Sequence, residues 1–465
     1  MTTAGTNLEN WADESAVRTM TPSQMGVGLL LVVLLAIAAV VFPLDTGIVL
    51  IAVATLLYLA ALVYRLTSFW LSIRHPEVIS ITDDEARAYP AKRLPVYTVL
   101  VPAYREPTVI VDLIQRLSQL EYPKSRLDIR LLLEEDDTET IAAARAARPG
   151  SQFSLVIVPN SAPKTKPKAC NYGLQEARGA LVTVFDAEDR PDPLQLRKAV
   201  VAFERVNPKV ACLQAKLSYY NSGQNMLTRW FTIEYGMWFS SLLPGLVSQR
   251  GPLPLGGTSN HFRAAVLQAI GGWDAYNVTE DADLGIRLAR RGYQTRVLDS
   301  TTYEEANSDV INWIKQRSRW YKGYLQTWLV HARHPRRLRR ELGWRGFIGF
   351  NLFIAGTPLL ALINPMFWAM TALWFLVHPP VVLELFPAWL YYLSLFVMVL
   401  GNVSLFYSWL VSARLIGRRD LVYAALLVPF YWALMSMAVA KAIIQLATAP
   451  SFWEKTVHGL DKTTA

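Results

Sequence analysis

The segment Leu181-Val-Thr-Val-Phe-Asp-Ala-Glu-Asp189 decides the fold, because a short apolar run passes directly into three acids. A run of this length that is rich in β-branched residues predicts a buried strand. Three similar runs lie upstream, and the second of them also ends in acids, at Glu134, Glu135, Asp136 and Asp137. These upstream runs cover residues 96–101, 129–133 and 154–158.

Segments with helical spacing of apolar residues separate the runs, at 108–120, 138–147 and 168–177. Strands that alternate with helices predict a mostly parallel, doubly wound α/β sheet. Ligands of such sheets lie beyond the carboxyl ends of the strands, so the acids mark the expected site. No GxGxxG or Walker A motif follows the first strand, which argues against a dinucleotide or P-loop site.

The composition points to a membrane protein with one sizeable polar domain. The chain has 465 residues, of which 52% are hydrophobic and 18% charged, and its formal charge is +9. These values exclude a disordered chain, and two cysteines exclude a disulfide framework or a four-cysteine zinc site. The basic run at 333–345 predicts anchoring to anionic lipid, with contact to a substrate phosphate as the alternative. We expect a lipid bilayer as a partner and no nucleic acid.

Apolar stretches of spanning length occur at both ends of the chain. Residues 19–44 and 46–64 predict a helical hairpin, and the acidic flank before them argues against a signal peptide. Residues 346–383 lack ionised side chains, and Asn364-Pro365 near their middle predicts a break between two spans. Residues 385–413 and 421–448 predict one span each. The expected total is six spans, two before the polar domain and four after it.

Basic residues beside the spans predict the orientation. Arg65 and Arg74 follow the second span and the 333–345 run precedes the third, so the middle of the chain and both termini are expected in the cytoplasm, at an inner membrane. Arg414, Arg418 and Arg419 conflict with six spans, because that count places their loop outside. Two explanations remain open: residues 346–383 form a single span plus a re-entrant or interfacial segment, or the positive-inside rule fails at this loop.

The chain therefore divides into five expected parts. They are a cytoplasmic N-terminal tail (1–23), a two-helix transmembrane hairpin (24–66), a cytoplasmic α/β domain with amphipathic interface helices (74–330), a C-terminal transmembrane region of about four spans (344–448), and a cytoplasmic tail that is a possible gating element (449–465).

Carboxylates that crowd at strand ends repel one another unless a cation neutralises them. Oxygen ligands with no His or Cys nearby favour Mg²⁺ or Mn²⁺. Such an ion is usually held by one or two carboxylates together with a substrate diphosphate. We therefore expect Mg²⁺ or Mn²⁺ at Asp186. The alternative for the acids is that they only cap helices or face solvent, and we prefer it for Glu134.

Five motifs occur in order along the chain. They are Val101-Pro-Ala-Tyr-Arg-Glu106, Lys168-Ala-Cys-Asn171, Asp186-Ala-Glu-Asp189, Thr279-Glu-Asp281 and Gln316-Arg-Ser-Arg-Trp320. The ordered set resembles the signature of membrane-embedded glycosyltransferase family 2 enzymes, which include cellulose, chitin and hyaluronan synthases. The resemblance covers residues 95–327, and the flanking spans match the family's layout. It implies a GT-A fold with the QxxRW motif and a UDP-sugar donor.

The resemblance assigns roles at the donor end. It implies that Tyr104 stacks on the uridine and that Glu106 hydrogen-bonds to it. One of Asp136 and Asp137 contacts the base, with Asp136 the first choice.

The same resemblance implies a charged pair of contacts to the diphosphate and its metal. Lys168 matches a lysine that faces the diphosphate. The alternative is that Lys168 is an ordinary surface lysine, because Lys164 and Lys166 lie close to it in the sequence. Asp186 matches the first acid of a DxD motif. The third position here is Glu188, so the second metal contact is Glu188 or, alternatively, Asp189.

The remaining motifs imply the catalytic residues. Asp281 matches a general base, which takes the proton of the acceptor hydroxyl in an inverting displacement, and Glu280 precedes it. The alternative is that Asp281 is only an acid in the first turn of a helix. Gln316, Arg319 and Trp320 are expected to contact the diphosphate and the acceptor sugar, or to belong to an amphipathic helix at the membrane interface.

The function implied by the resemblance is an inverting, metal-dependent hexosyltransferase. It would move sugar from a UDP-sugar to a growing β-linked exopolysaccharide, processively, β-glucan-like, and coupled to translocation across the membrane, with an accessory export subunit as a possible partner. The first alternative is a non-processive enzyme that acts on a lipid or short acceptor. A remote alternative is a non-catalytic transporter or scaffold.

Overall fold

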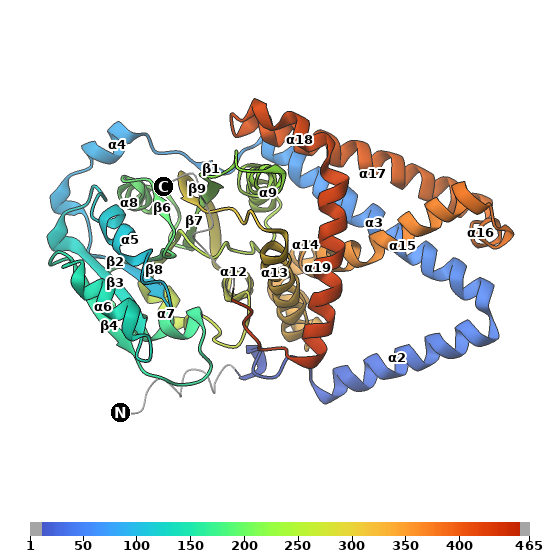
Figure 1. Ribbon diagram of the computed structural model, residues 1–465, viewed down its shortest axis with the longest axis horizontal. Coiled ribbons are helices and arrows are strands. Elements are labelled where there is room, and N and C mark those ends of the chain that lie inside the picture. The colour runs from blue at the N-terminus through green and yellow to red at the C-terminus, as the bar shows by residue number, and fades with distance from the viewer. Residues whose placement is uncertain (1–11, 456–465) are drawn as a thin grey trace.

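The structure is a computed structural model, and it describes residues 12–455. Residues 1–11 and 456–465, including part of each expected tail, lie outside the described residues. An α/β domain occupies the left of Figure 1, and long helices from both ends of the chain extend to the right.

The α/β domain is built on one mixed sheet with the order β1-β9-β7-β8-β5-β2-β3-β4, and β6 pairs with β9. The neighbours of β2 and β3 are parallel, as are β1, β7 and β9, whereas β8 and β6 run antiparallel to theirs. The strands are β1 (Val78–Ile79), β2 (Tyr97–Ala103), β3 (Leu127–Glu134), β4 (Phe153–Val158), β5 (Leu181–Val184), β6 (Arg190–Pro191), β7 (Val210–Tyr219), β8 (Asn260–Arg263) and β9 (Gln294–Glu304). The expected α/β class with a mostly parallel sheet is confirmed.

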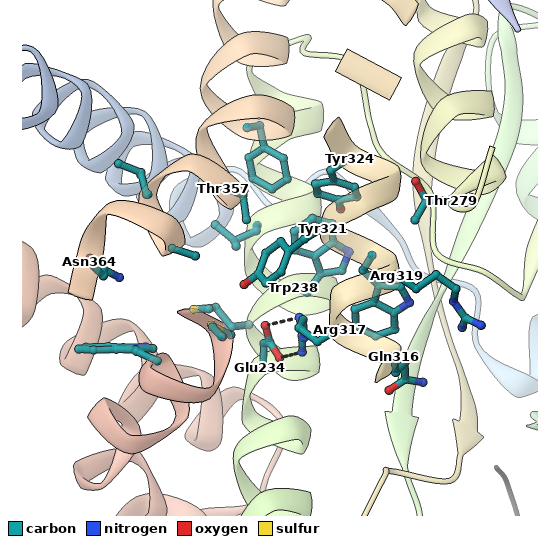
Figure 2. Close-up of a pocket in the computed structure, with 18 of the residues that line it drawn as sticks. Glu234, Trp238, Thr279, Gln316, Arg317, Arg319, Tyr321, Tyr324, Thr357 and Asn364 are labelled. Carbon is teal, nitrogen blue, oxygen red and sulfur yellow. Dashed lines mark hydrogen bonds and ion pairs between the residues drawn. The ribbon is translucent and has the colours of Figure 1, made fainter. Parts of the chain in front are cut away.

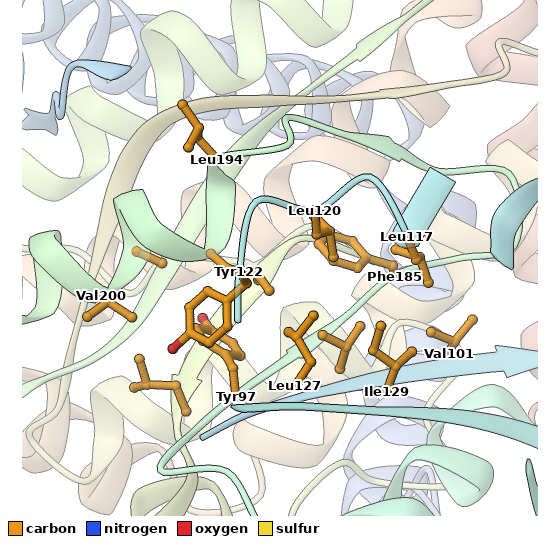
Figure 3. Packing of buried hydrophobic residues seen from close by; sticks show 14 of the residues in the cluster. Tyr97, Val101, Leu117, Leu120, Tyr122, Leu127, Ile129, Phe185, Leu194 and Val200 are labelled. Carbon is orange, nitrogen blue, oxygen red and sulfur yellow. The ribbon is translucent and has the colours of Figure 1, made fainter. Parts of the chain in front are cut away.

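Alternating side chains of the central strands enter two different cores. Val99 and Val101 of β2 pack on one face of the sheet, and Leu100 between them packs on the other. Figure 3 shows the first core, where Tyr97, Ile129 and Phe185 meet side chains from the covering helices. Fully burying one such apolar side chain stabilises the fold by roughly 1.5–3 kcal/mol. Burial on both faces explains why the strands read as nearly continuous apolar runs.

The helices of this domain cover both faces of the sheet. The three helices expected between the first strands are present as α5, α6 and α7. The helices are α4 (Asp83–Ala88), α5 (Ile110–Leu117), α6 (Thr138–Ala146), α7 (Lys166–Gln175), α8 (Gln195–Arg205), α9 (Met226–Met237), α10 (Leu243–Ser248), α11 (Ala264–Ala269), α12 (Glu280–Arg290) and α13 (Val310–His331).

Five helices are long and apolar enough to cross a membrane in the described part of the chain. The last three of these helices are connected through the short helices α16 (Pro380–Leu385) and α18 (Val422–Leu426). The five are α2 (Pro22–Val41), α3 (Pro43–Arg74), the joined helices α14 (Pro335–Phe350) and α15 (Gly356–Val377), α17 (Ala388–Leu415) and α19 (Val428–Thr448).

The expected break at Asn364-Pro365 does not occur, because α15 continues through Pro365. A proline inside a membrane helix is tolerated where a neighbouring helix supplies hydrogen bonds near the missing N–H. Tyr58 of α3 does so here: its hydroxyl donates to the carbonyl of Leu360 at 2.9 Å and also contacts the Asn364 side chain. Residues 346–383 therefore form one long helical unit and the short α16, rather than two spans.

The arginine-rich loop after α17 lies against the α/β domain, not on the opposite side as six spans required. Arg418 donates to the Ser222 hydroxyl, and the Trp230 indole of α9 donates to the Ala424 carbonyl at 2.8 Å. Figure 1 shows α19 running crosswise to α15 and α17, and it packs along α13. Helix α19 is long and apolar enough to span a membrane. However, it runs along α13, so both ends of α19 and the loop that precedes it lie beside the α/β domain. The basic loop thus agrees with the positive-inside pattern.

The described parts of both tails also lie on the α/β domain. Glu14 forms ion pairs with Arg290 at 3.1 Å and Arg291 at 2.7 Å, and the Ser15 hydroxyl donates to Asp274 at 3.0 Å. At the other end, the Glu454 carbonyl accepts from Arg319 of α13. The described parts of both tails and the domain therefore share one side of the helical region.

Candidate active site

One cavity of about 1510 Å³ runs from the carboxyl edge of the sheet into the space between the long helices. Side chains from β2, β3, α7, α12 and α13 and from the turn after β5 line its sheet end, and side chains from α3, α15 and α17 line its other end. Figure 2 shows the middle of this cavity, where α13 passes between the two ends. The expected site residues that line it are Tyr104, Glu106, Asp186, Glu188, Glu280, Asp281, Gln316, Arg319 and Trp320.

The acids after β5 divide into two that face the cavity and one that does not. Asp186 and Glu188 line the cavity. Asp189 is fully buried, and its carboxylate accepts hydrogen bonds from the Asp186 backbone at 2.8 Å and from the Thr258 hydroxyl. Burial, with the charges of Asp186 and Glu188, raises the pKa of Asp189 well above its usual value. Asp189 therefore shapes the turn, and Glu188 is the better candidate for a second metal contact.

Lys166, rather than Lys168, lies among the acids. The Lys166 ammonium is 2.5 Å from Asp186 and donates to the Gly257 carbonyl at 2.7 Å. Lys168 instead binds Glu134 at 2.9 Å and the carbonyls of Pro159 and Ser161. The structure does not bring Lys168 to the cavity. Residues two apart on a helix point about 200° apart, so only one of these lysines can face the site.

The donor set fits a small hard cation held with the help of a diphosphate. Asp186 and Glu188 offer carboxylate oxygens, and the ion pair with Lys166 shows that Asp186 attracts a cation. Glu304, at the end of β9, also lines the cavity, and burial with the charges of the neighbouring acids raises its pKa well above its usual value. The described residues contain no group of three acids, histidines or cysteines with metal-binding geometry, so other ligands would have to come from substrate or water.

Tyr104 and Asp136 lie together at the rim of the cavity. The Tyr104 hydroxyl is 3.4 Å from the Asp136 carboxylate, which also pairs with Lys164 at 2.6 Å. Asp137 caps α6 and accepts from the Arg105 backbone, where a positive φ of 57° turns the loop. Of the two acids left open, Asp136 lies beside Tyr104 and Lys164, and Asp137 supports the loop.

Glu280 and Asp281 start α12, and both line the cavity. Thr279 precedes the helix but makes no capping hydrogen bond, and the Asp281 carboxylate accepts from the Ala282 backbone at 2.7 Å. Burial raises the pKa of Asp281 to about 6. Burial and the charge of Asp281 raise the pKa of Glu280 to about 8. A carboxylate with a pKa near neutrality is suited to accept a proton.

Helix α13 is held very close to these acids. A Cβ on Gly323 would lie 2.3 Å from the Thr279 hydroxyl, so only glycine allows this approach. Figure 2 shows Arg319 turned toward the strands and Arg317 turned the other way, toward Glu234. Trp320 stacks on Tyr235 with ring centroids 6.2 Å apart. Gln316 accepts from Asn307 at 2.8 Å.

Residues 449–455 form a strap across the sheet end of the cavity. Lys322 and Gln326 of α13 donate to the carbonyls of Phe452 at 2.6 Å and Pro450 at 2.9 Å. The Arg319 guanidinium lies 4.7 Å from the Trp453 ring centroid. The Lys455 ammonium donates to the Tyr104 carbonyl at 2.5 Å, so the strap joins the Tyr104 loop to α13.

A charged pair that the motifs did not reveal lies where the cavity leaves the sheet. Arg317 pairs with Glu234 of α9 in a two-pronged contact, and Tyr431 of α19 donates to the same carboxylate at 2.5 Å. Arg317 occupies an unspecified position inside the QxxRW motif, and Glu234 lies among aromatic residues, so neither stood out in the sequence.

Residues 95–323 match the sequence model of the family described as Glycosyltransferase like family 2. Residues 95–323 form a glycosyltransferase family 2 domain. The resemblance drawn from the five motifs is thereby confirmed, and the matched residues contain all five of them.

Two curated relatives indicate how far the similarity extends. The "Probable glycosyltransferase YdaM" of Bacillus subtilis is 28% identical over 235 residues, which cover 50% of this chain and 56% of that protein. The β-monoglucosyldiacylglycerol synthase of a Synechocystis species is 26% identical over 382 residues, 78% of this chain and 75% of that protein. The match to YdaM thus spans little more than half of that relative's length.

A solved structure shares the fold of this protein. The mannosyltransferase PcManGT from Pyrobaculum calidifontis, in complex with GDP-Man and Mn²⁺, superposes with a TM-score of 0.52 at 17% identity. The superposition covers 82% of this chain and 99% of that chain. The likeness confirms the GT-A fold expected for the α/β domain.

Proposed function

We propose that this glycosyltransferase is inverting and metal-dependent, and that it transfers a sugar from a UDP-sugar to the end of a growing β-linked glycan that leaves through the membrane cavity. The main support for this proposal is that a single cavity joins the carboxylates at the sheet edge to the space between α3, α15 and α17. On α15 the lining extends from Thr357 to Phe375, about 27 Å along the helix axis. This length matches the roughly 30 Å hydrocarbon core of a bilayer.

The sheet end has the chemistry to hold the donor. Tyr104 and Glu106 line the rim where the uridine would lie, with Asp136 beside them. Asp186 and Glu188 would hold Mg²⁺ or Mn²⁺, which would supply positive charge against the diphosphate. Lys166 and Arg319 supply fixed positive charge to the same leaving group, and both feel the charge of Asp186.

Asp281 is the proposed general base. Its pKa of about 6 leaves the carboxylate ionised at neutral pH, yet basic enough to take the proton of an acceptor hydroxyl as the oxygen attacks the anomeric carbon. Gly257 keeps the space in front of it open: a Cβ there would lie 3.4 Å from the Asp281 carboxylate. Attack from the face opposite to the leaving UDP inverts the configuration. The higher pKa of about 8 leaves Glu280 largely protonated, which suits a hydrogen-bonding role.

The acceptor would approach Asp281 from the membrane side. Aromatic rings that can offer flat faces to sugars follow one another along the cavity, from Trp320 and Tyr324 on α13 to Trp368 on α15 and Trp409 on α17. The proposed orientation places the α/β domain in the cytoplasm, where the basic residues beside the helices predict it. An accessory export subunit would continue the path beyond the far end, near Phe386.

A second candidate is a single transfer to a membrane lipid. The membrane end of the cavity carries many aliphatic side chains, such as Leu360, Met398 and Leu405, which suit acyl chains. The name of the Synechocystis relative, β-monoglucosyldiacylglycerol synthase, describes a glucolipid product. The assembled acids and the family membership leave no reason to propose a non-catalytic transporter or scaffold.

The decisive experiment follows UDP release and product size with purified protein, a panel of UDP-sugars, and Mg²⁺ or Mn²⁺. Turnover of one donor with polymeric product, abolished by Asp281→Asn, is expected. Lipid-linked or short product alone would replace the first candidate by the second. Absence of both turnover and donor binding would refute the transferase proposal.

A further inference from the structure

Arg65 introduces an uncompensated positive charge into the membrane end of the cavity. It lies on α3, lines the cavity, and donates to the Thr357 hydroxyl of α15 at 3.0 Å. Its Nε is buried and makes no hydrogen bond to any described residue. Within residues 12–455, no carboxylate lies within 4.0 Å of its guanidinium.

The nearby acid does not neutralise this charge. Glu234, Tyr58, Tyr321 and Tyr324 are the ionisable groups close enough to influence Arg65. Glu234 is committed elsewhere, because its two oxygens accept from Arg317 and Tyr431. The Glu234–Arg317 pair is neutral as a unit, so Arg65 contributes a net positive charge to its surroundings.

An unpaired charge in a membrane cavity is costly and therefore marks a candidate binding site. A guanidinium presents a fork of N–H donors that matches a phosphate. Next to Arg65, Thr357 and Tyr58 offer hydroxyls, and beyond them the lining turns aliphatic at Leu62, Leu360 and Ala361. An uncharged glycan could not neutralise the charge of Arg65. A soluble anion could neutralise it but would make no favourable contact with the aliphatic side chains. A phosphate attached to acyl or prenyl chains uses both features.

We propose that Arg65 and Thr357 form a binding site for the phosphate group of a membrane lipid, which serves as the acceptor or as the primer of the glycan. Tyr324 lines the same cavity as Arg65 and Asp281 and interacts with the charges of both. A lipid held at Arg65 would direct its headgroup toward Asp281. The inference rests on the proposed function only in taking the cavity as the acceptor's path.

The test measures lipid retention without any donor or turnover. The purified full-length protein is equilibrated with phosphatidylcholine nanodiscs that contain either phosphatidate or diacylglycerol with the same acyl chains, and co-purified lipid is counted by native mass spectrometry. Wild type is expected to retain phosphatidate over diacylglycerol. Arg65→Gln should lower phosphatidate retention about tenfold, the loss of roughly one charge-assisted contact. Arg65→Lys should keep part of it.

Arg74→Gln is the matched control. It lies at the end of the same helix, where its guanidinium stacks on Trp70 outside the cavity, and it should leave retention unchanged. UDP binding in the same samples should be equal in all variants, which shows that Arg65→Gln is folded and that the donor site is separate. Equal retention by Arg65→Gln and wild type, or equal retention of the two lipids by wild type, would overturn the proposal.

A further arm identifies the source of the phosphate. Water-soluble glycerol phosphate is added at the concentration of the doped lipid. If it displaces phosphatidate, the site takes a free phosphate ester and the lipid assignment is wrong. If it does not, the acyl chains contribute as proposed. This experiment measures lipid binding, whereas the proposed function is tested by turnover. The two results are independent, so a failure of this inference can be told apart from a failure of the proposed function.

Discussion

The two ends of the cavity solve the problem of buried charge in opposite ways. At the sheet end, acids and bases are crowded together: Lys166 lies 2.5 Å from Asp186, and Asp281 and Glu280 are adjacent. At the membrane end, charges are few and are either paired, as in Glu234–Arg317, or left alone, as in Arg65. Crowding shifts protonation equilibria and so serves chemistry, whereas isolation leaves a charge available to a ligand. The contrast predicts that substitutions at the sheet end change rate, and that those toward the membrane change what is bound.

The largest expected effect is that of Asp281→Asn. The amide cannot accept the acceptor proton, so turnover should fall by about 10²–10⁴-fold, the usual contribution of a general base. UDP binding should persist, because Asp281 is not assigned to the donor. Initial rates of UDP release together with calorimetric UDP binding would show this split. Asp84→Asn, at an exposed acid of α4, is the control. Loss of UDP affinity equal to the loss of rate would remove Asp281 from the role of base.

The second prediction concerns pH. Burial raises the pKa of Asp281 to about 6, and only the ionised form can act as base. Turnover should therefore be steady above that pH and fall by up to about tenfold per pH unit below it. The measurement is the rate with saturating donor from about pH 5 to about pH 8, with circular dichroism at each pH to confirm folding. A rate that stays flat down to about pH 5 would contradict a base with a raised pKa.

The third prediction separates the two lysines of α7. Lys166→Ala should lower turnover about 10- to 100-fold, because a charge-assisted contact at the acids is lost. Lys168→Ala should instead cost about 1–3 kcal/mol of unfolding free energy, because it leaves the buried Glu134 without its partner. Paired measurements of turnover and urea unfolding test the split. If Lys168→Ala lost rate without losing stability, the family-based assignment of Lys168 to the diphosphate would be restored.

This pair of lysines also shows what sequence reasoning could reach and where it stopped. The strands, the acids after β5 and the start of α12 followed from apolar runs and motif order, because a buried parallel strand leaves a clear local pattern. The face that a short helix turns toward a cavity depends on its docking, so the sequence motif pointed to Lys168, whereas Lys166 is the lysine that lies beside Asp186. Long-range contacts decided the rest: Tyr58 supports α15 near Pro365, and Trp230 holds the loop before α19. No local sequence pattern indicated that Glu234, Arg317 or Glu304 would line the cavity.

The smallest effect is expected where the strap closes over the sheet end. Arg319 stacks on Trp453 at 4.7 Å, and the same strap holds Tyr104 through Lys455. Trp453→Ala should raise the donor KM about 2- to 5-fold with little change in kcat, because a partly exposed cation–π contact is weak and Arg319 keeps its charge. The matched control is Trp344→Ala, which removes an Arg–Trp stack of equal length, with Arg339, outside the cavity.

These two substitutions sharpen the contrast between the ends of the cavity. Both tryptophans contact an arginine in the same way. Any difference in kinetics between the two variants therefore comes from the position of the tryptophan relative to the cavity, not from the type of contact that is lost. If Trp453→Ala changes the donor KM and Trp344→Ala does not, the strap belongs to the donor site and closes it from the membrane side. Equal, unchanged kinetics would mean that the strap only anchors the end of α19. A fall in kcat with KM constant would place Trp453 with the reacting groups, and the sheet end would then extend further toward the membrane than the acids alone indicate.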